Sequence, residues 1–354
     1  MILSKIWERK LFFNTLKLIL FFLVAIFMIV IVIDFSIHGA KIFAHSKTSI
    51  SLILKYYFNL FFIQLNLFLA LTFLLAIIKV LSDMNIHHEL TALRMAAISA
   101  KKLSRPFFII AILISIISFI NFQYFYPKSL SFKDSFKEKY LKKTNYAKKM
   151  QPSVIYLEDG AKLVYQKYDQ LQNKLFDAYF IKNSSDIWHA KYLTFNEKEA
   201  VGKYVDHLTR KDKNFEKIES YESYSFKDIE IDENINMFEP FENRSITNLF
   251  KQNLSKNICL KEKNEILSYL NYKLAMPFVS LIIVLAIFPP LIAFSKNISI
   301  FFICTFALFG FIIFHTIMDS ALILAENAAR APYIILWLPI IIISFIFGRR
   351  FKKI

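Results

Sequence analysis

Six long apolar stretches constrain the fold of this chain more than any other feature of its sequence. A helix needs about 20 residues to cross a hydrocarbon core of about 30 Å, and each stretch is close to that length. Because open strands leave backbone polar groups unpaired in lipid, these segments are expected to be helices. Apolar residues make up 56% of the 354 residues, more than in an ordinary soluble domain. The predicted spans are Leu11–Ile33, Tyr56–Ile78, Phe107–Tyr126, Leu274–Phe294, Ile298–Met318 and Ala331–Gly348.

The net charge of +16 is distributed in a way that indicates a membrane and no nucleic acid partner. Residues 127–273 hold 26 Lys and Arg against 22 Asp and Glu, so most of the excess lies in short segments beside the apolar stretches. In these short segments, 13 Lys and Arg lie on one side of the membrane and 4 on the other. The positive-inside rule therefore predicts that both termini are cytoplasmic and that residues 127–273 face outward. No small-residue cleavage site follows the first stretch, so we do not expect a cleaved signal peptide.

The chain divides into three parts. Residues 1–126 hold three predicted spans and an amphipathic cytoplasmic helix at about 83–99, and residues 274–354 hold three spans and a basic tail. Residues 127–273 contain several short β-rich runs without a helical period, which predicts an antiparallel sandwich or jelly roll. The expected strands are Val154–Leu157, Leu163–Tyr165, Leu175–Ile181, Tyr192–Phe195 and Ile218–Phe226, with a tight turn at Glu158–Gly160 and helical connections at 127–150 and 244–273.

Several classes of chemistry are excluded by residues that are missing or badly spaced. Two cysteines, Cys259 and Cys304, do not make a disulfide framework, and five scattered glycines do not make a phosphate-binding loop. The cluster His87-His88-Glu89 does not suit a metal ion, because adjacent histidines diverge by about 100° on a helix. We therefore expect no catalytic residue, metal or cofactor, and energy from ATP must come from another chain.

Polar residues within the apolar stretches leave an alternative open. His315 and Asp319 are four residues apart and face the same side of a helix, so a secondary transporter with a proton relay is one interpretation. An interfacial pair or a helix cap is the simpler explanation. Asn66 and Asn121 are expected to form hydrogen bonds between helices. A sensor with an outward β domain would need a large cytoplasmic output domain, which the short loops do not provide.

The second cytoplasmic loop is the most informative segment for function. In Asp83–Ser99, Leu90 and Leu93 fall on an apolar stripe, while Glu89 and Arg94 lie off it. Such a helix buries its stripe either on the membrane surface or in the groove of a partner, and the pattern alone does not choose between them.

The same segment resembles a known family. Glu89-Leu-Thr-Ala-Leu-Arg-Met-Ala-Ala-Ile-Ser99 is similar to the coupling-helix signature of the lipopolysaccharide-export permeases LptF and LptG. Glu89 matches the family's Glu, and residues 96–99 match its closing turn of a small residue, Gly, a hydrophobic residue and Ser or Thr. Ala97 replaces the usual Gly. The order of parts along the whole chain also fits, including the segments 271–277 and 332–339.

The resemblance implies a permease subunit of an ABC exporter in the bacterial inner membrane, with an inserted periplasmic jelly-roll-like domain. Its implied partners are a cytoplasmic ATPase dimer, a paralogous permease, a single-span periplasmic bridge component and lipopolysaccharide. The choice between the two paralogues stays open, and a lipoprotein-release-type permease is a further alternative. The residues expected to couple to the ATPase are Glu89, Leu90, Leu93, Arg94 and Ser99, and the lipid-binding candidates are Lys41, Lys128 and Lys133.

Overall fold

The computed structural model separates the chain into two compact units, which are described one at a time. The first unit comprises Met1–Leu130, Phe241–Leu254 and Lys261–Ile354, and the second comprises Ser131–Pro240 and Ser255–Leu260. The structure describes residues 5–44, 49–137, 153–156, 161–169, 174–183, 185–195, 200–211, 214–226, 240–254, 260–292, 300–327 and 331–352. The predicted turn at Glu158–Gly160 and Cys259 lie outside these residues.

The first unit is helical and confirms the six predicted spans. Within the described residues, six helical stretches are long and apolar enough to cross a membrane. They extend beyond most of the predicted spans, because the helices continue into polar flanking residues. Their principal helices are α1 (Ile6–Ala44), α2 (Ile50–Ile86), α4 (Ala100–Ile120), α8 (Val279–Ile292), α9 (Ile300–Glu326) and α10 (Pro332–Lys352).

Shorter helical segments continue the third and fourth spans. Helix α4 passes through a π-helical turn, η1 (Asn121–Phe125), into α5 (Tyr126–Phe136). Before α8 come α7 (Leu260–Ala275) and the short helix η4 (Met276–Phe278), where Pro277 occupies an early position that needs no backbone donor. The remaining segments are η3 (Phe241–Asn243) and α6 (Ile246–Leu254), and the helical character expected for the connecting regions is present in α5, α6 and α7.

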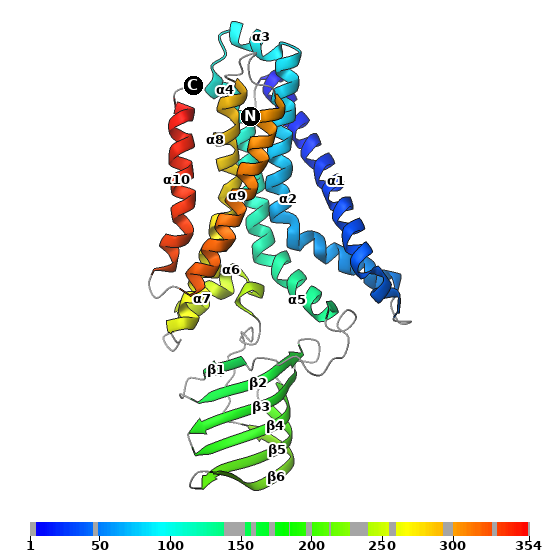
Figure 1. Ribbon diagram of the computed structural model, residues 1–354, viewed down its shortest axis with the longest axis vertical. Coiled ribbons are helices and arrows are strands. Elements are labelled where there is room, and N and C mark those ends of the chain that lie inside the picture. Colours follow the sequence, from blue (N-terminus) through cyan, green and yellow to red (C-terminus); the bar gives the residue numbers. More distant parts are fainter. Residues whose placement is uncertain are drawn as a thin grey trace. The chain divides into compact units, whose positions relative to one another are not determined.

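The centre of the helical unit is formed by α2, α4 and α8, which pack against one another (Figure 1). Phe73, Phe107 and Phe288, one from each of these helices, have no exposed surface. By contrast, α1, α9 and α10 expose many large apolar side chains, among them Met28 and Phe306. An apolar surface of this extent faces lipid or another protein rather than water.

Small polar side chains join the central helices inside the apolar core. Ser115 of α4 donates a hydrogen bond to the Pro277 carbonyl over 2.7 Å. Ser118 and Asn121 donate to the side-chain oxygen of Asn66 over 2.9 and 3.2 Å, which confirms the interhelical bonds expected for the two asparagines. Such bonds satisfy polar groups that lipid would leave unpaired.

The second unit contains a six-stranded antiparallel sheet, so the predicted antiparallel β domain is confirmed. Its strands follow one another in chain order across the sheet, as in a meander. A jelly roll interleaves two Greek keys, and the described strands do not have that order, because each pairs with its immediate successor. The strands are β1 (Ser153–Tyr156), β2 (Lys162–Asp169), β3 (Lys174–Asn183), β4 (Asp186–Phe195), β5 (Ala200–Lys211) and β6 (Asn214–Phe226). Strand β5 was not expected from the sequence.

One face of this sheet forms its own apolar core. Leu175 and Val205 have no exposed surface, and Trp188 stacks on His207 and Tyr224 with ring centroids 4.1 and 4.7 Å apart. Gly202 lies opposite Leu193 on the same sheet, where an added Cβ would come within 2.6 Å of Val205 Cγ2. The β unit is therefore packed tightly around these residues.

Candidate functional site

The short helix α3 (Glu89–Met95) lies between α2 and α4, at the end of the helical unit where α1 begins (Figure 1). It is separated from its neighbours by two residues with left-handed backbone, His88 with φ 56° and Ala97 with φ 57°. The predicted segment 83–99 thus comprises the last turn of α2, the helix α3 and the turn that leads into α4. Because of these two left-handed residues, α3 does not continue the axis of α2 or of α4.

The turn after α3 is a Schellman motif, built from two backbone hydrogen bonds. The Ile98 amide donates to the Leu93 carbonyl over 3.2 Å, and the Ala97 amide donates to the Arg94 carbonyl over 3.0 Å. The residue at the Ala97 position of this motif adopts a left-handed conformation, which glycine tolerates best. Glycine is therefore favoured at this position, and Ala97 forms the tight turn with some strain.

The inner face of α3 packs against the helical unit. Leu90 is 3% exposed and belongs to the main apolar core, and Leu93 and Ile98 pack half-buried against that core. The apolar stripe expected from the sequence is therefore buried within the chain itself. Ser99 precedes α4, but its hydroxyl forms no capping hydrogen bond, and the backbone carbonyl of Ser99 accepts from Lys102 instead.

The outer face of α3 remains accessible. The Glu89 side chain is 45% exposed and forms an ion pair with Lys10 of α1, with 2.9 Å between Nζ and Oε1. Met95 is 84% exposed and Ile86, at the end of α2, is 60% exposed. A carboxylate and two large apolar side chains are thus accessible on or next to α3, as are the small residues of α3.

Arg94 does not point to this outer face. Its Nη1 donates to the carbonyl of Ile292, the last residue of α8, over 3.4 Å. Asn85, in the last turn of α2, donates to the neighbouring Leu291 carbonyl over 3.0 Å. Arg94 was expected from its sequence context to couple to a partner, and Asn85 was not expected to have a role. No local signal could have found this arrangement, because the residues are about 200 positions apart.

The beginning of α1 is also in contact with α4. Glu8 is 4% exposed, and its carboxylate lies 3.9 Å from Nη1 of Arg105 in α4. With the Lys10–Glu89 pair, this contact ties the first turns of α1 to both α3 and α4. Neither Glu8 nor Lys10 belongs to a recognisable motif, so no role was expected for them from the sequence.

The three lipid-binding candidates lie in two helices. Lys41 lies in α1, and its side chain is outside the described part of the chain. Lys128 and Lys133 both lie in α5, the first exposed and the second half-buried. Lys128 belongs to the helical unit and Lys133 to the other.

The acidic residues near the ends of the spans have partners on other helices. Tyr56 of α2 donates to Asp34 of α1 over 3.3 Å, and Tyr272 of α7 donates to Asp319 of α9 over 2.8 Å. Among the described residues, no hydrogen bond joins His315 to Asp319, and the His315 ring packs against Phe311 with 4.6 Å between centroids. The described residues also contain no group of three potential metal ligands. This geometry supports interhelical bonding rather than a relay.

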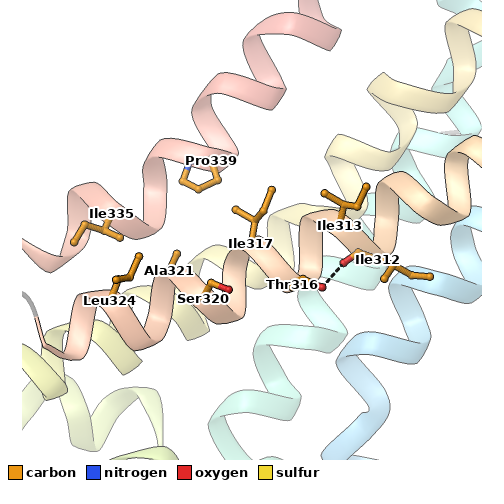
Figure 2. Close-up of a pocket in the computed structure, with 9 residues that line it drawn as sticks. All are labelled: Ile312, Ile313, Thr316, Ile317, Ser320, Ala321, Leu324, Ile335 and Pro339. Atoms are coloured by element: carbon orange, nitrogen blue, oxygen red, sulfur yellow. Dashed lines mark hydrogen bonds between the residues drawn. The ribbon is translucent and has the colours of Figure 1, made fainter.

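An apolar groove of about 430 Å³ lies between α9 and α10 (Figure 2). Its polar side chains add little to the surface, because the Thr316 hydroxyl donates to the Ile312 carbonyl of its own helix over 2.9 Å. The groove therefore presents hydrocarbon to its surroundings. It is lined by Ile312, Ile313, Thr316, Ile317, Ser320, Ala321, Leu324, Ile335 and Pro339.

Comparison with known families identifies the chain. Residues 9–353 match the family model described as "Lipopolysaccharide export system permease LptF/LptG". No curated protein matches the sequence at a significant level. The match covers essentially the whole chain, including α3, all six membrane-spanning stretches and the inserted sheet. The chain is therefore a multi-pass membrane protein that belongs to the lipopolysaccharide-export permease family LptF/LptG.

Proposed function

We propose that this protein is the permease subunit of an ABC exporter that extracts lipopolysaccharide from the bacterial inner membrane and passes it to a periplasmic bridge. A separate cytoplasmic ATPase dimer supplies the energy. The absence of a phosphate-binding loop from the sequence supports an ATPase in trans. Membership of the permease family supports the substrate.

The observation that carries this proposal is the way α3 is held. Its apolar stripe is buried against its own chain, so the helix is already ordered before any partner binds. Its accessible face presents Glu89, Met95 and the neighbouring Ile86. A pre-ordered helix that leaves a carboxylate and apolar side chains exposed is suited to a partner groove with a cationic residue, at little cost in conformational entropy.

The proposed orientation places α3 and both termini in the cytoplasm. The positive-inside distribution of Lys and Arg supports it. The contacts from Lys10 to Glu89 and from Arg105 to Glu8 place the N-terminal turns of α1 beside α3 and α4, so the N-terminus and α3 are proposed to share one side of the membrane. The inserted sheet then lies in the periplasm, where it is available to receive the lipid.

The other partners are assigned from the exposed apolar faces. Two membrane partners, the paralogous permease subunit and the single-span component of the bridge, would bind to apolar surfaces within the membrane. Helices α1 and α9 offer such surfaces through exposed residues that include Met28, Ile29, Phe306 and Phe309. Lys41, Lys128 and Lys133 are proposed to pair with the phosphate groups of the lipid, since an ammonium group binds phosphate as a point charge. Photocrosslinkers placed at these three positions should trap lipopolysaccharide in cells. Failure at all three would remove these lysines from the lipid site.

The test of the proposed function uses the assembled complex in proteoliposomes. The permease should co-purify with an ATPase subunit, and lipopolysaccharide should leave the vesicles only when ATP is hydrolysed. A control with a proton gradient and no ATP should release none. Release driven by the gradient alone would favour a secondary transporter and contradict the proposal.

A further inference from the structure

The cytoplasmic end of α8 receives hydrogen bonds from two side chains of the segment around α3. Asn85 Nδ2 donates to the Leu291 carbonyl over 3.0 Å, and Arg94 Nη1 donates to the Ile292 carbonyl over 3.4 Å. Leu291 and Ile292 are themselves buried, with 0% and 3% exposure. The two donors come from different helices, α2 and α3, and both bonds end on the last two residues of α8.

The end of α8 needs such partners. The last four carbonyls of a helix lack an intrahelical donor, and they form the negative end of the helix dipole. Pro289 and Pro290 also lie within the last turn and carry no amide hydrogen, so the final turns of α8 hold fewer backbone bonds than usual. An amide donor and a guanidinium group at this end satisfy two carbonyls, and the guanidinium also complements the dipole.

The side chains of α3 connect this helix to two others, so a displacement of α3 would act on those two helices. In the part of the chain that the structure describes, Glu89 bonds to α1 and Arg94 bonds to α8. The bond to α1 joins two half-exposed side chains, whereas the bond to α8 ends on a buried backbone. Helix α8 packs against α2, α4 and α10, so a movement of its end reaches the centre of the helical unit.

We propose that Arg94 and Asn85 are positioning residues. Arg94 transmits the movement of α3 to α8, and Asn85 holds the end of α2, just before α3, on the same turn of α8. The inference rests on the proposed function, because it assumes that an ATPase moves α3. Arg94 then acts inside the permease, between α3 and the fourth span, and Glu89 acts at the partner. The conformational change of the ATPase is then transmitted to the membrane-spanning helices through the last turn of α8.

The experiment measures lipopolysaccharide released per ATP hydrolysed in proteoliposomes that contain the whole complex. In Asn85→Asp, a group of nearly the same size replaces the amide donor with an acceptor that repels the Leu291 carbonyl. In Arg94→Met, the side chain keeps a similar length but loses both its charge and its hydrogen-bond donors. The amount of lipopolysaccharide released per ATP hydrolysed should fall roughly tenfold in each variant. A factor of that size corresponds to the loss of one hydrogen bond from a charged or well-oriented donor. Asn85→Gln and Arg94→Lys keep a donor and should recover most of the ratio.

A matched control separates transmission from a general effect of adding a carboxylate. Asn327→Asp makes the same change at the end of α9, where the Asn327 amide bonds only to the Ile323 carbonyl of its own helix. Among the described residues, the Asn327 side chain has no hydrogen bond to another helix, so this variant should keep the wild-type ratio. An unchanged ratio in Asn85→Asp and Arg94→Met would overturn the inference. If the wild-type complex itself shows no ATP-dependent release, the proposed function fails instead, so the two failures are distinguishable.

Discussion

Lys10 and Glu89, which are 79 residues apart in the sequence, form an ion pair at the end of the helical unit where α3 lies. The Lys10 ammonium donates to both carboxylate oxygens of Glu89, over 2.9 and 3.1 Å. With 58% and 45% of the two side chains exposed, the pair is solvated and contributes about 0–1 kcal/mol to stability. Glu89 can therefore exchange Lys10 for a cationic residue of a partner at little cost.

We predict that Glu89→Lys leaves the permease folded and inserted but weakens its association with the ATPase. A charge pair that loses one member at a protein interface costs roughly 2–5 kcal/mol, because the remaining charge is left unpaired. The amount of ATPase that co-purifies should fall at least tenfold, and lipid release should fall with it. The measurement compares wild type and variant at matched expression.

A charge exchange distinguishes the partner from the internal pair. In the double variant Lys10→Glu with Glu89→Lys, the internal ion pair is restored with its charges reversed. Association with the ATPase should stay low, since the partner still meets the wrong charge. Recovery of association in the double variant would mean that Glu89 matters only for its contact with Lys10.

Replacement of Ala97 by glycine should stabilise the turn after α3. An L-residue in the left-handed region costs roughly 1–2 kcal/mol, and glycine removes most of that strain. Hydrogen exchange of the peptide that covers α3 should become slower in Ala97→Gly. The control is Ala96→Gly, since Ala96 has φ −74° and glycine gains nothing there. Slower exchange in both variants would show that the backbone angle is not the cause.

The orientation is tested by labelling engineered cysteines in intact cells. Glu222 in β6 and Lys352 at the end of α10 are both exposed, so a cysteine at either position is accessible from its own side of the membrane. In a background where Cys259 and Cys304 are replaced by serine, an impermeant maleimide should label position 222 and spare position 352. Labelling of position 352 alone would show that the orientation is the opposite of the proposed one and that α3 is not in the cytoplasm.

Gly202→Ala should destabilise the sheet. The added Cβ would lie 2.6 Å from Val205 Cγ2 and 2.9 Å from Phe226 Cε2, and overpacking of this kind costs about 1–3 kcal/mol. Hydrogen exchange in β4–β6 should become faster while exchange in α2 and α4 stays unchanged. Gly310→Ala serves as the control, because in the described part of the chain a Cβ added at Gly310 meets no atom within 4 Å apart from its own helix's nearby backbone. Equal exchange in Gly202→Ala and wild type would contradict the packing argument.

The β unit should lose stability in acid through Asp206. Lys217, whose Nζ lies 2.7 Å from the Asp206 carboxylate, lowers the pKa of that carboxyl below its ordinary value. A lowered pKa in the folded state contributes stability above the unfolded value of about 3.9, and that contribution is lost as the pH falls through the folded pKa. Amide hydrogen exchange in β5 and β6 should therefore be faster in the Asp206→Asn variant than in wild type near pH 7. This difference between the two proteins should shrink near pH 3. A difference that grows in acid would contradict the assignment.

The sequence by itself determined the membrane-spanning part and the position of α3 between the second and third spans. Apolar runs and amphipathic periods depend on neighbouring residues, so they can be read locally. Most strands were found in the same way, from short β-rich runs such as Leu175–Ile181. Strand β5 was missed because its polar and charged residues, among them Lys203, Asp206 and His207, hide the alternation.

Only the tertiary structure decided the order of the strands and the partners of the side chains around α3. The register of β5 depends on its pairing with both β4 and β6, and the left-handed backbone at Ala97 depends on how Leu93 and Ile98 pack against the core. The hydrogen bond from Arg94 to Ile292 joins residues 198 positions apart, so no local pattern encodes it. Propensity and periodicity report the free energy of a segment with its neighbours, whereas these contacts follow from the packing of helices that are distant in the sequence.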